Sequence, residues 1–242
     1  MGSPGTDEDG ASGRPVPSAG CPVCGQMTYG RNPCTNRWCS RADRAVSVVF
    51  PVGIHHGALR QAIVRYKYRG ERGWAEVFAR MVASYLASNA TWFEEFHLIV
   101  GVPGYTGPGA RRMWDPVGDI LFRLDGLTGS EWPIGRQVII KRLETPPMRG
   151  RPWSERQAIA AGPLRQALFV TDPAAIGGSR VLLLDDVMTE GSTLHEVGRA
   201  LLKAGAAEVA GLVLTRPPSP ALASRATLRS PPGSGRVWSC RV

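Results

Sequence analysis

The sequence predicts an α/β fold with a central parallel sheet flanked by helices. Residues 181–184 form a short, unbroken apolar run, which is typical of a strand buried on both faces of a parallel sheet. Leu194, Val197 and Leu201 then repeat at helical spacing, and a second apolar run covers residues 209–214. These segments form a strand–helix–strand unit, and 242 residues are enough to bury one sizeable core with a small appendage.

Two further strands and two further helices are expected in the first half of the chain, where apolar runs alternate with apolar residues at helical spacing. The strands are expected at 45–52 and 97–103, and the helices at 58–68 and 74–86. His55 and His56 lie between the first strand and the first helix. Because no cysteine or acid stands at ligand spacing from them, both are expected at the surface.

Two adjacent carboxylates and a short polar turn follow the run at 181–184. Asp185 and Asp186 are expected at the carboxyl edge of the sheet, where open α/β sheets bind ligands. Thr193 and Glu196 have the spacing of a capping box, which leaves the backbone N–H groups of residues 189–193 facing outward, as a phosphate requires. The two acids can accept hydrogen bonds from vicinal sugar hydroxyls or face a hydrated Mg²⁺. Diol, phosphate and metal together indicate phosphoribosyl pyrophosphate (PRPP) as the ligand.

The same segment resembles the PRPP-binding signature of type I phosphoribosyltransferases, in which four apolar residues precede Asp-Asp and Val-x-Thr-x-Gly-x-Thr. The resemblance implies the type I phosphoribosyltransferase fold, with Asp185 and Asp186 on the ribose hydroxyls. It implies a loop that holds the 5′-phosphate, made of Thr189, Glu190, Gly191, Ser192 and Thr193. Position 190 departs from the family, which usually has a small or hydroxyl residue there. The alternative is an ordinary tight turn whose acids are solvated.

Four of the five cysteines lie close together, as the pairs Cys21/Cys24 and Cys34/Cys39. Their x2 and x4 spacings are those of structural zinc sites, and four thiolates on Zn²⁺ would stabilise a segment too short to have a core. The pattern predicts a zinc ribbon at residues 21–44, with a structural or docking role. Disulfides are the weaker alternative, because the compartment is expected to be reducing.

Cations alternate with aromatic residues between the two predicted helices, from Arg65 to Arg72. In isolation, this pattern is also that of a nucleic-acid patch. The run Lys-Tyr-Arg-Gly at 67–70 is similar to a segment of the ComF-like (competence protein F) branch of phosphoribosyltransferases, which also begins with a four-cysteine zinc module. The resemblance implies that Lys67 and Arg69 lie near the active-site opening as phosphate or pyrophosphate contacts. A solvated helix end is the alternative.

The loop after the strand at 97–103 looks like the pyrophosphate loop of the family. The resemblance implies that the loop containing Pro103 and Gly104 presents backbone N–H groups to the leaving pyrophosphate, and that Arg111 and Arg112 stabilise its charge. The ComF-like pattern then continues Arg-Gly-Phe-Asn-Gln. Here, residues 112–116 read Arg-Met-Trp-Asp-Pro, so Arg112 is the one clear match.

The resemblance stays loose as far as residue 165. Family positions that match are Lys141-Arg142, Thr145 and Glu155-Arg156. The customary Gln and Asn are replaced by Met148 and Ile159. These polar positions accompany the mobile hood of the family, which recognises the base, so their loss puts the acceptor in doubt.

A formal charge of +9 and a pI near 9.9 come mostly from arginine, which suits phosphorylated metabolites or nucleic acid. No run approaches the roughly 18 apolar residues of a membrane span, and residues 1–20 have no signal-peptide core, so no membrane insertion and a cytoplasmic location are expected. The ends at 1–20 and 217–242, the latter with an unpaired Cys240, read as disordered tails around a phosphoribosyltransferase domain at 45–216.

The predicted function is transfer of ribose 5-phosphate from Mg²⁺-bound PRPP to a nucleobase acceptor, with release of pyrophosphate. The alternative is a non-catalytic accessory of the DNA-uptake machinery, which binds single-stranded DNA or a partner through the zinc ribbon and the basic face. A generic nucleotide-binding protein is disfavoured, because neither GxxxxGK[ST] nor a strand-linked GxGxxG is present.

Overall fold

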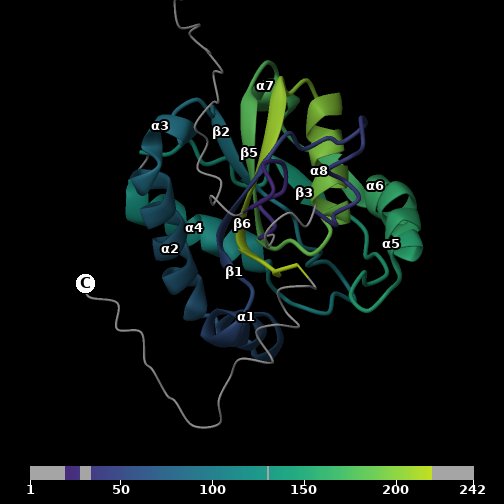
Figure 1. Cartoon of the computed structure of the whole chain (residues 1–242), viewed down its shortest axis with the longest axis horizontal. Helices are drawn as coiled ribbons and strands as arrows, with labels where there is room; N and C mark the ends of the chain where they lie inside the picture. The colour runs from purple at the N-terminus through teal and green to yellow at the C-terminus, as the bar shows by residue number, and fades with distance from the viewer. Residues whose placement is uncertain (1–19, 28–33, 130, 220–242) are drawn as a thin grey trace, which may run out of the picture.

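A four-stranded parallel sheet forms the centre of the computed structural model, which describes residues 20–27, 34–129 and 131–219 (Figure 1). The strand order is β1-β6-β5-β2. The strands are β1 (Val49–Ile54), β6 (Glu208–Arg216), β5 (Arg180–Val187) and β2 (Leu98–Gly101). The predicted α/β class with a central parallel sheet is therefore confirmed. The first strand begins later than expected, because the chain from residue 45 first contacts α8 (Ser192–Lys203) and β6.

Alternate side chains of the sheet enter two separate cores, which explains why its central strands are apolar without a break. Leu182 and Leu184 of β5 pack with α2 (Trp74–Ser88) and α4 (Pro116–Thr128). Val181 and Leu183 pack on the opposite face against α8. Figure 1 shows α2 and α4 on one side of the sheet and α8 on the other.

The first helix, α1 (Gly57–Arg69), runs close to its predicted range and carries the Lys-Tyr-Arg-Gly run at its end. Gly70 stops it in the left-handed conformation with φ 71°. Tyr66 is fully buried, and its hydroxyl donates a hydrogen bond to the Pro116 carbonyl at 2.7 Å. This bond joins α1 to the start of α4 and fixes the direction in which the neighbouring Lys67 leaves the helix.

The segment from 139 to 170 forms a separate unit beside α8. Its strands β3 (Ile139–Lys141) and β4 (Leu168–Val170) pair antiparallel. Between them lie α5 (Trp153–Ile159), the π-helical turn η1 (Ala160–Leu164) and α6 (Arg165–Ala167). Two short helices elsewhere are α3 (Ala90–Phe93) and α7 (Pro173–Ile176). The unit places α5 next to the N-terminus of α8.

The cysteine-rich segment packs directly on the sheet. The N–H of Val49 in β1 donates to the Val23 carbonyl at 2.8 Å, and Cys21 and Cys24 share a core with α8. Gly25 has φ +62°, and a Cβ there would stand 2.4 Å from Pro51 Cδ. Only glycine therefore fits this turn beside β1.

Most of the two predicted tails lies outside the described residues, as do residues 28–33 of the predicted ribbon and Cys240. Among the helices that the structure describes, none has both the length and the apolar character that crossing a membrane requires.

Candidate functional site

A cavity of about 360 Å³ lies at the carboxyl ends of β5 and β1. Its size is that of a small-molecule site, and this edge is where open parallel sheets bind ligands. The lining includes Asp185, Lys67, His55 and Arg156, together with residues 189–193, called here the phosphate loop. The structure therefore brings together the acid segment, the loop and two cations of α1, Lys67 and Arg60.

Asp186 and Lys67 form a buried ion pair beside this cavity. The ammonium of Lys67 lies 2.9 Å from Asp186 Oδ1 and 2.7 Å from Oδ2. Burial alone would lower the pKa of Lys67, but the charge of Asp186 and its hydrogen bond raise it above the ordinary value. Lys67 therefore stays charged, and it balances one of the two adjacent carboxylates.

Asp185 has no such partner. Its Oδ1 accepts the backbone N–H of Asp186 at 2.9 Å, and no donor for Oδ2 is found within the described segments. Burial, with the neighbouring charge of Asp186, raises the pKa of Asp185 to about 8. A half-buried carboxyl that lacks a donor gains stability from hydroxyl groups or a cation, so it fits both a sugar diol and a hydrated Mg²⁺.

The phosphate loop leaves its backbone donors open. Gly191 has φ +97° and a Cβ there would lie 2.5 Å from Met188 Cε, so the turn into α8 requires glycine. Throughout the part of the chain that is described, no acceptor is found for the N–H groups of residues 189–193. These groups lie at the positive end of a twelve-residue helix, where they suit an anion.

The predicted capping box is wrong. The residue before α8 is Gly191, and no side chain caps the helix. Glu196 instead accepts two hydrogen bonds from Arg165, at 2.5 and 3.1 Å, and Thr193 Oγ1 lies 3.4 Å from Met148 Sδ. A guanidinium from α6 is a stronger partner for Glu196 than a backbone amide, and the loop N–H groups stay open as a result.

Glu190, the position that departs from the family signature, pairs with Arg156 of α5. Glu190 Oε2 and Arg156 Nε are buried and lack a partner among the described residues. Gln157, also from α5, donates to Ser192 Oγ at 2.6 Å. Helix α5 therefore holds the phosphate loop at two points, and Arg156 counters the negative charge that Glu190 brings there.

The loop after β2 is arranged differently. Pro103 and Gly104 line a separate cavity of about 590 Å³. The N–H of Gly104, an expected pyrophosphate donor, already donates to Asp115 Oδ2 at 3.0 Å. Burial raises the pKa of Asp115, which also caps α4 by accepting the N–H of Val117 at 3.1 Å.

The three remaining predicted cations lie outside the lining of the 360 Å³ cavity. Arg69 is exposed at the end of α1. Arg111 has an exposed fraction of 67% and lies 3.8 Å from Glu144. Arg112 Nε donates to the Lys67 carbonyl at 2.8 Å, and its guanidinium lies 5.1 Å from the centre of the Tyr68 ring. Arg112 therefore braces α1.

The prediction that His55 is a surface residue is wrong. His55 is half-buried, lines the cavity, and places Nδ1 2.9 Å from Thr215 Oγ1. Burial lowers its pKa. The signal that could have found it is its position directly after a predicted parallel strand, at the edge that collects functional residues.

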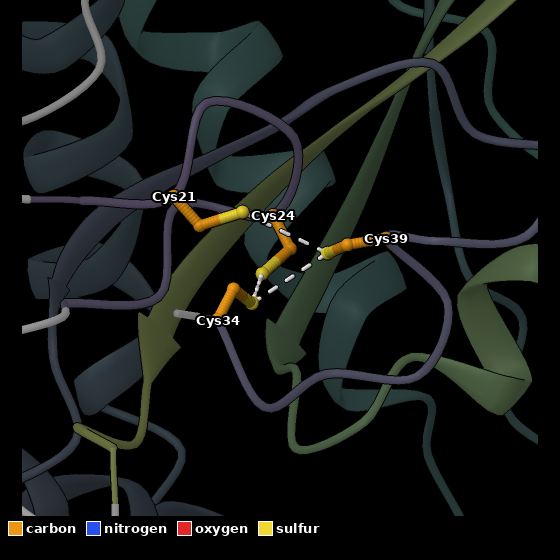
Figure 2. Close-up of side chains that lie close together, drawn as sticks. All are labelled: Cys21, Cys24, Cys34 and Cys39. Carbon is orange, nitrogen blue, oxygen red and sulfur yellow. Dashed lines mark hydrogen bonds between the residues drawn. The ribbon is translucent and has the colours of Figure 1, made fainter. Parts of the chain in front are cut away.

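The four cysteines converge from two turns of the chain (Figure 2). The Sγ–Sγ distances are 3.7 Å for Cys21–Cys39, 3.5 Å for Cys24–Cys34 and 3.7 Å for Cys34–Cys39. Zn–S bonds of about 2.3 Å in a tetrahedron place the sulfur atoms about 3.8 Å apart. The cluster can therefore hold a metal ion such as zinc.

Comparison with known proteins supports a phosphoribosyltransferase relationship. The family model described as "Phosphoribosyl transferase domain" matches residues 149–231, about a third of the chain. The match includes β5, the phosphate loop, α8 and β6. It does not distinguish the ComF-like branch, which stays a prediction. A search of curated proteins gave no match.

Two solved structures are similar at low identity. One is entitled "Structure of the allosteric regulatory enzyme of purine biosynthesis", with 20% identity, a TM-score of 0.37, and coverage of 59% of this chain and 26% of that one. The chain thus spans about a quarter of that protein's length. The other is a hypoxanthine phosphoribosyltransferase from Staphylococcus aureus, with 11% identity, a TM-score of 0.34, and coverage of 61% and 75%.

Proposed function

We propose that the protein binds PRPP and transfers its ribose 5-phosphate to a nitrogenous base, with release of pyrophosphate. The observation that carries the proposal is the open row of N–H groups at residues 189–193, beside the unpaired carboxyl of Asp185 in one cavity. The family match over the same residues supports it.

Each end of the donor has a complementary partner. The 5′-phosphate binds the N–H groups of the phosphate loop, and the ribose hydroxyls donate to Asp185 and Asp186. Asp185 would hold the Mg²⁺ that accompanies PRPP through a carboxylate oxygen, and the ion would supply positive charge to the pyrophosphate. Lys67, paired with Asp186, adds positive charge beside the ribose.

The leaving pyrophosphate is proposed to move toward the loop that contains Pro103 and Gly104. This step requires Asp115 to give up the Gly104 N–H, because a donor engaged at 3.0 Å cannot also serve the anion at full strength. Arg69, Arg111 and Arg112 are proposed to supply positive charge on that side as the C1–oxygen bond breaks. Most of the rate comes from this electrostatic stabilisation and from holding the acceptor against C1.

We keep the ComF-like assignment, the cytoplasmic location and the division into a ribbon at 21–44 and a transferase domain at 45–216 as parts of this proposal. Zinc at Cys21, Cys24, Cys34 and Cys39 is proposed to be structural, because four filled ligand positions leave none for substrate.

The test is calorimetric titration of PRPP with Mg²⁺ into the wild type and an Asp185→Asn/Asp186→Asn variant. We expect micromolar binding that the variant loses, since both ribose acceptors change together. Glu94→Gln/Glu95→Gln is the matched control: it also neutralises two adjacent acids, and both are exposed and outside the cavity lining.

Asp185→Asn alone guards against misfolding, because it leaves the Lys67–Asp186 ion pair intact. A folded, zinc-loaded wild type that does not bind PRPP would refute the transferase proposal. Release of pyrophosphate in the presence of individual nucleobases then identifies the acceptor.

One observation favours the second candidate, the non-catalytic accessory of DNA uptake. The Tyr68 ring is 52% exposed, with the guanidinium of Arg112 5.1 Å and that of Arg149 5.0 Å from its centre. An aromatic ring between cations is a platform for single-stranded DNA. Binding of oligothymidylate that falls steeply with salt and is lost in Tyr68→Ala, without PRPP binding by the wild type, would favour this function instead.

A further inference from the structure

The buried guanidinium of Arg216 joins the cysteine cluster to the phosphate loop. Arg216 ends β6 and is 3% exposed. Its Nη1 donates to the Met188 carbonyl at 3.2 Å and to the Thr189 carbonyl at 2.9 Å. Its Nη2 donates to Cys24 Sγ at 3.1 Å. One planar group thus contacts a predicted metal ligand and the backbone beside the phosphate loop.

The charge of Arg216 is balanced by sulfur. Within the described ranges, no carboxylate contacts its guanidinium, and its Nε has no partner. A buried cation without a counter-charge costs several kcal/mol. Four thiolates around one Zn²⁺ carry a net charge of −2, which supplies that counter-charge. Metal bound by the four cysteines fixes Cys24 Sγ at the point where Arg216 donates to it, so the metal-holding cluster keeps Arg216 in place.

The two carbonyl contacts determine where the loop N–H groups point. In a trans peptide the C=O and the following N–H are directed to opposite sides. When Arg216 holds the carbonyls of Met188 and Thr189 on the cluster side, the N–H groups of Thr189 and Glu190 point the other way. That direction leaves them open, as the phosphate site requires.

The cysteine-rich segment also contacts the neighbours of the loop. Trp38 stacks on His195 of α8 with ring centroids 4.1 Å apart, and Arg37 lies 4.8 Å from the centre of the Trp153 ring at the start of α5. Helix α5 is the element that supplies Arg156 and Gln157 to the loop. The segment therefore contacts both helices that flank the phosphate loop, α8 and α5.

We infer that Arg216 is a positioning residue through which the thiolate cluster orients the N–H groups of the phosphate loop, so that phosphate binding depends on metal held by remote cysteines, of which Cys24 lies 192 positions before Arg216. The inference rests on the proposed function for its ligand, but not for its geometry. Loss of the metal lets the cysteine turns move apart, so that Arg216 loses its contact with Cys24 Sγ, releases the two carbonyls and leaves the peptide units free to turn.

The test compares the wild type with Arg216→Lys, each with zinc and after chelation under reducing conditions. A lysine keeps the charge but cannot span the sulfur and both carbonyls. We expect zinc removal to weaken PRPP binding at least tenfold in the wild type. Zinc-loaded Arg216→Lys should show the same loss, with little further change on chelation, because the two perturbations act through one contact.

Arg199→Lys is the matched control. Arg199 also ties α8 to the cysteine-rich segment, donating to the Asp43 carbonyl at 3.1 Å, but it contacts no residue of the phosphate loop. Its variant should keep both PRPP affinity and the zinc effect. Arg216→Gln replaces Arg216→Lys if the lysine variant does not fold.

Hydrogen exchange of the amides at 189–193, measured without PRPP, separates this inference from the proposed function. Faster exchange after zinc removal in the wild type, absent in Arg216→Lys, supports the inference even if PRPP does not bind. If PRPP binds but neither zinc removal nor Arg216→Lys changes affinity or exchange, the inference is overturned and the proposed function stands.

Discussion

The two loops at the carboxyl edge of the sheet differ in what already occupies their backbone donors. The phosphate loop at 189–193 is held by carbonyl and side-chain contacts from Arg216, Arg156 and Gln157, all of which leave its N–H groups open. The loop after β2 is held through an N–H group itself, that of Gly104, by the carboxylate of Asp115.

The comparison shows that a loop can offer its N–H groups to an anion only when other groups, such as its backbone carbonyls, make the contacts that hold it in place. A loop supported through carbonyls keeps its donors for the ligand, whereas one supported through its N–H groups must first break a hydrogen bond. An anion that bound the phosphate loop would therefore need no rearrangement, and one that bound the Gly104 N–H would have to displace Asp115.

The largest expected effect comes from Gly191→Ala, which tests whether PRPP binding depends on the backbone conformation of the phosphate loop. Gly191→Ala places a Cβ 2.5 Å from Met188 Cε at φ +97°, which costs about 1–2 kcal/mol and turns the loop. We expect PRPP affinity to fall at least tenfold by calorimetry. Gly109→Ala in the other loop, at φ +77° with no atom near the added Cβ, pays the same backbone cost and should leave affinity unchanged.

The protein should become less stable at acid pH because of His195, in the helix that follows the phosphate loop. Burial lowers the pKa of His195 from 6.5 to about 3, so the folded protein keeps it neutral while the unfolded chain takes up a proton. This stability is present above pH 6.5 and is lost as the pH falls from 6.5 toward 3.

Between about pH 7 and about pH 5.5, the free energy of unfolding of the wild type should fall about 1 kcal/mol more than that of His195→Gln. Urea titrations at the two pH values measure this difference. His56→Gln changes an exposed histidine, so its free energy of unfolding should fall as much as that of the wild type. An equal fall in all three proteins would show that His195 is not the cause.

The loop after β2 can be tested by removing the charge of Asp115, which accepts the Gly104 N–H. Asp115 uses Oδ2 for Gly104 and Oδ1 for the cap of α4, so Asp115→Asn keeps only one of these acceptors and removes a buried negative charge next to the expected pyrophosphate. Affinity for inorganic pyrophosphate should rise about fivefold, or about 1 kcal/mol. Unchanged affinity would mean that pyrophosphate does not bind at this loop.

The smallest effect is expected at Arg111. Its side chain is two-thirds exposed and lies 3.8 Å from Glu144, a geometry worth little in solution. Arg111→Ala should change pyrophosphate affinity less than about twofold. A loss of tenfold or more would show that Arg111 contacts pyrophosphate directly instead of adding positive charge at a distance.

The sequence was sufficient to predict the architecture and to place Asp185 and residues 189–193 together at one edge of the sheet. The unbroken apolar run of β5 required burial on both faces, and Asp185, Asp186 and Gly191 follow it within one turn. These features depend on residues that are adjacent in the sequence, so the sequence pattern predicts them directly.

The partners of these residues could not be predicted. Lys67 contacts Asp186 across 119 positions, and Arg216 contacts Cys24 across 192. The predicted capping box failed for the same reason, because the Arg165 guanidinium reaches Glu196 only after α6 packs beside α8. Each such contact depends on tertiary packing, which no spacing rule records.

The position of β6 between β1 and β5 has a consequence for how the protein forms during synthesis. Strands β1, β2 and β5 leave the ribosome before β6, yet Val49 of β1 pairs with Gly211 and Leu183 of β5 pairs with the same residue. The two halves of the sheet therefore stay separate until β6 is made, and such non-local pairing is slow. Arg216, at the end of that strand, arrives last, so the nascent chain can fill its cysteine cluster well before the phosphate loop is set.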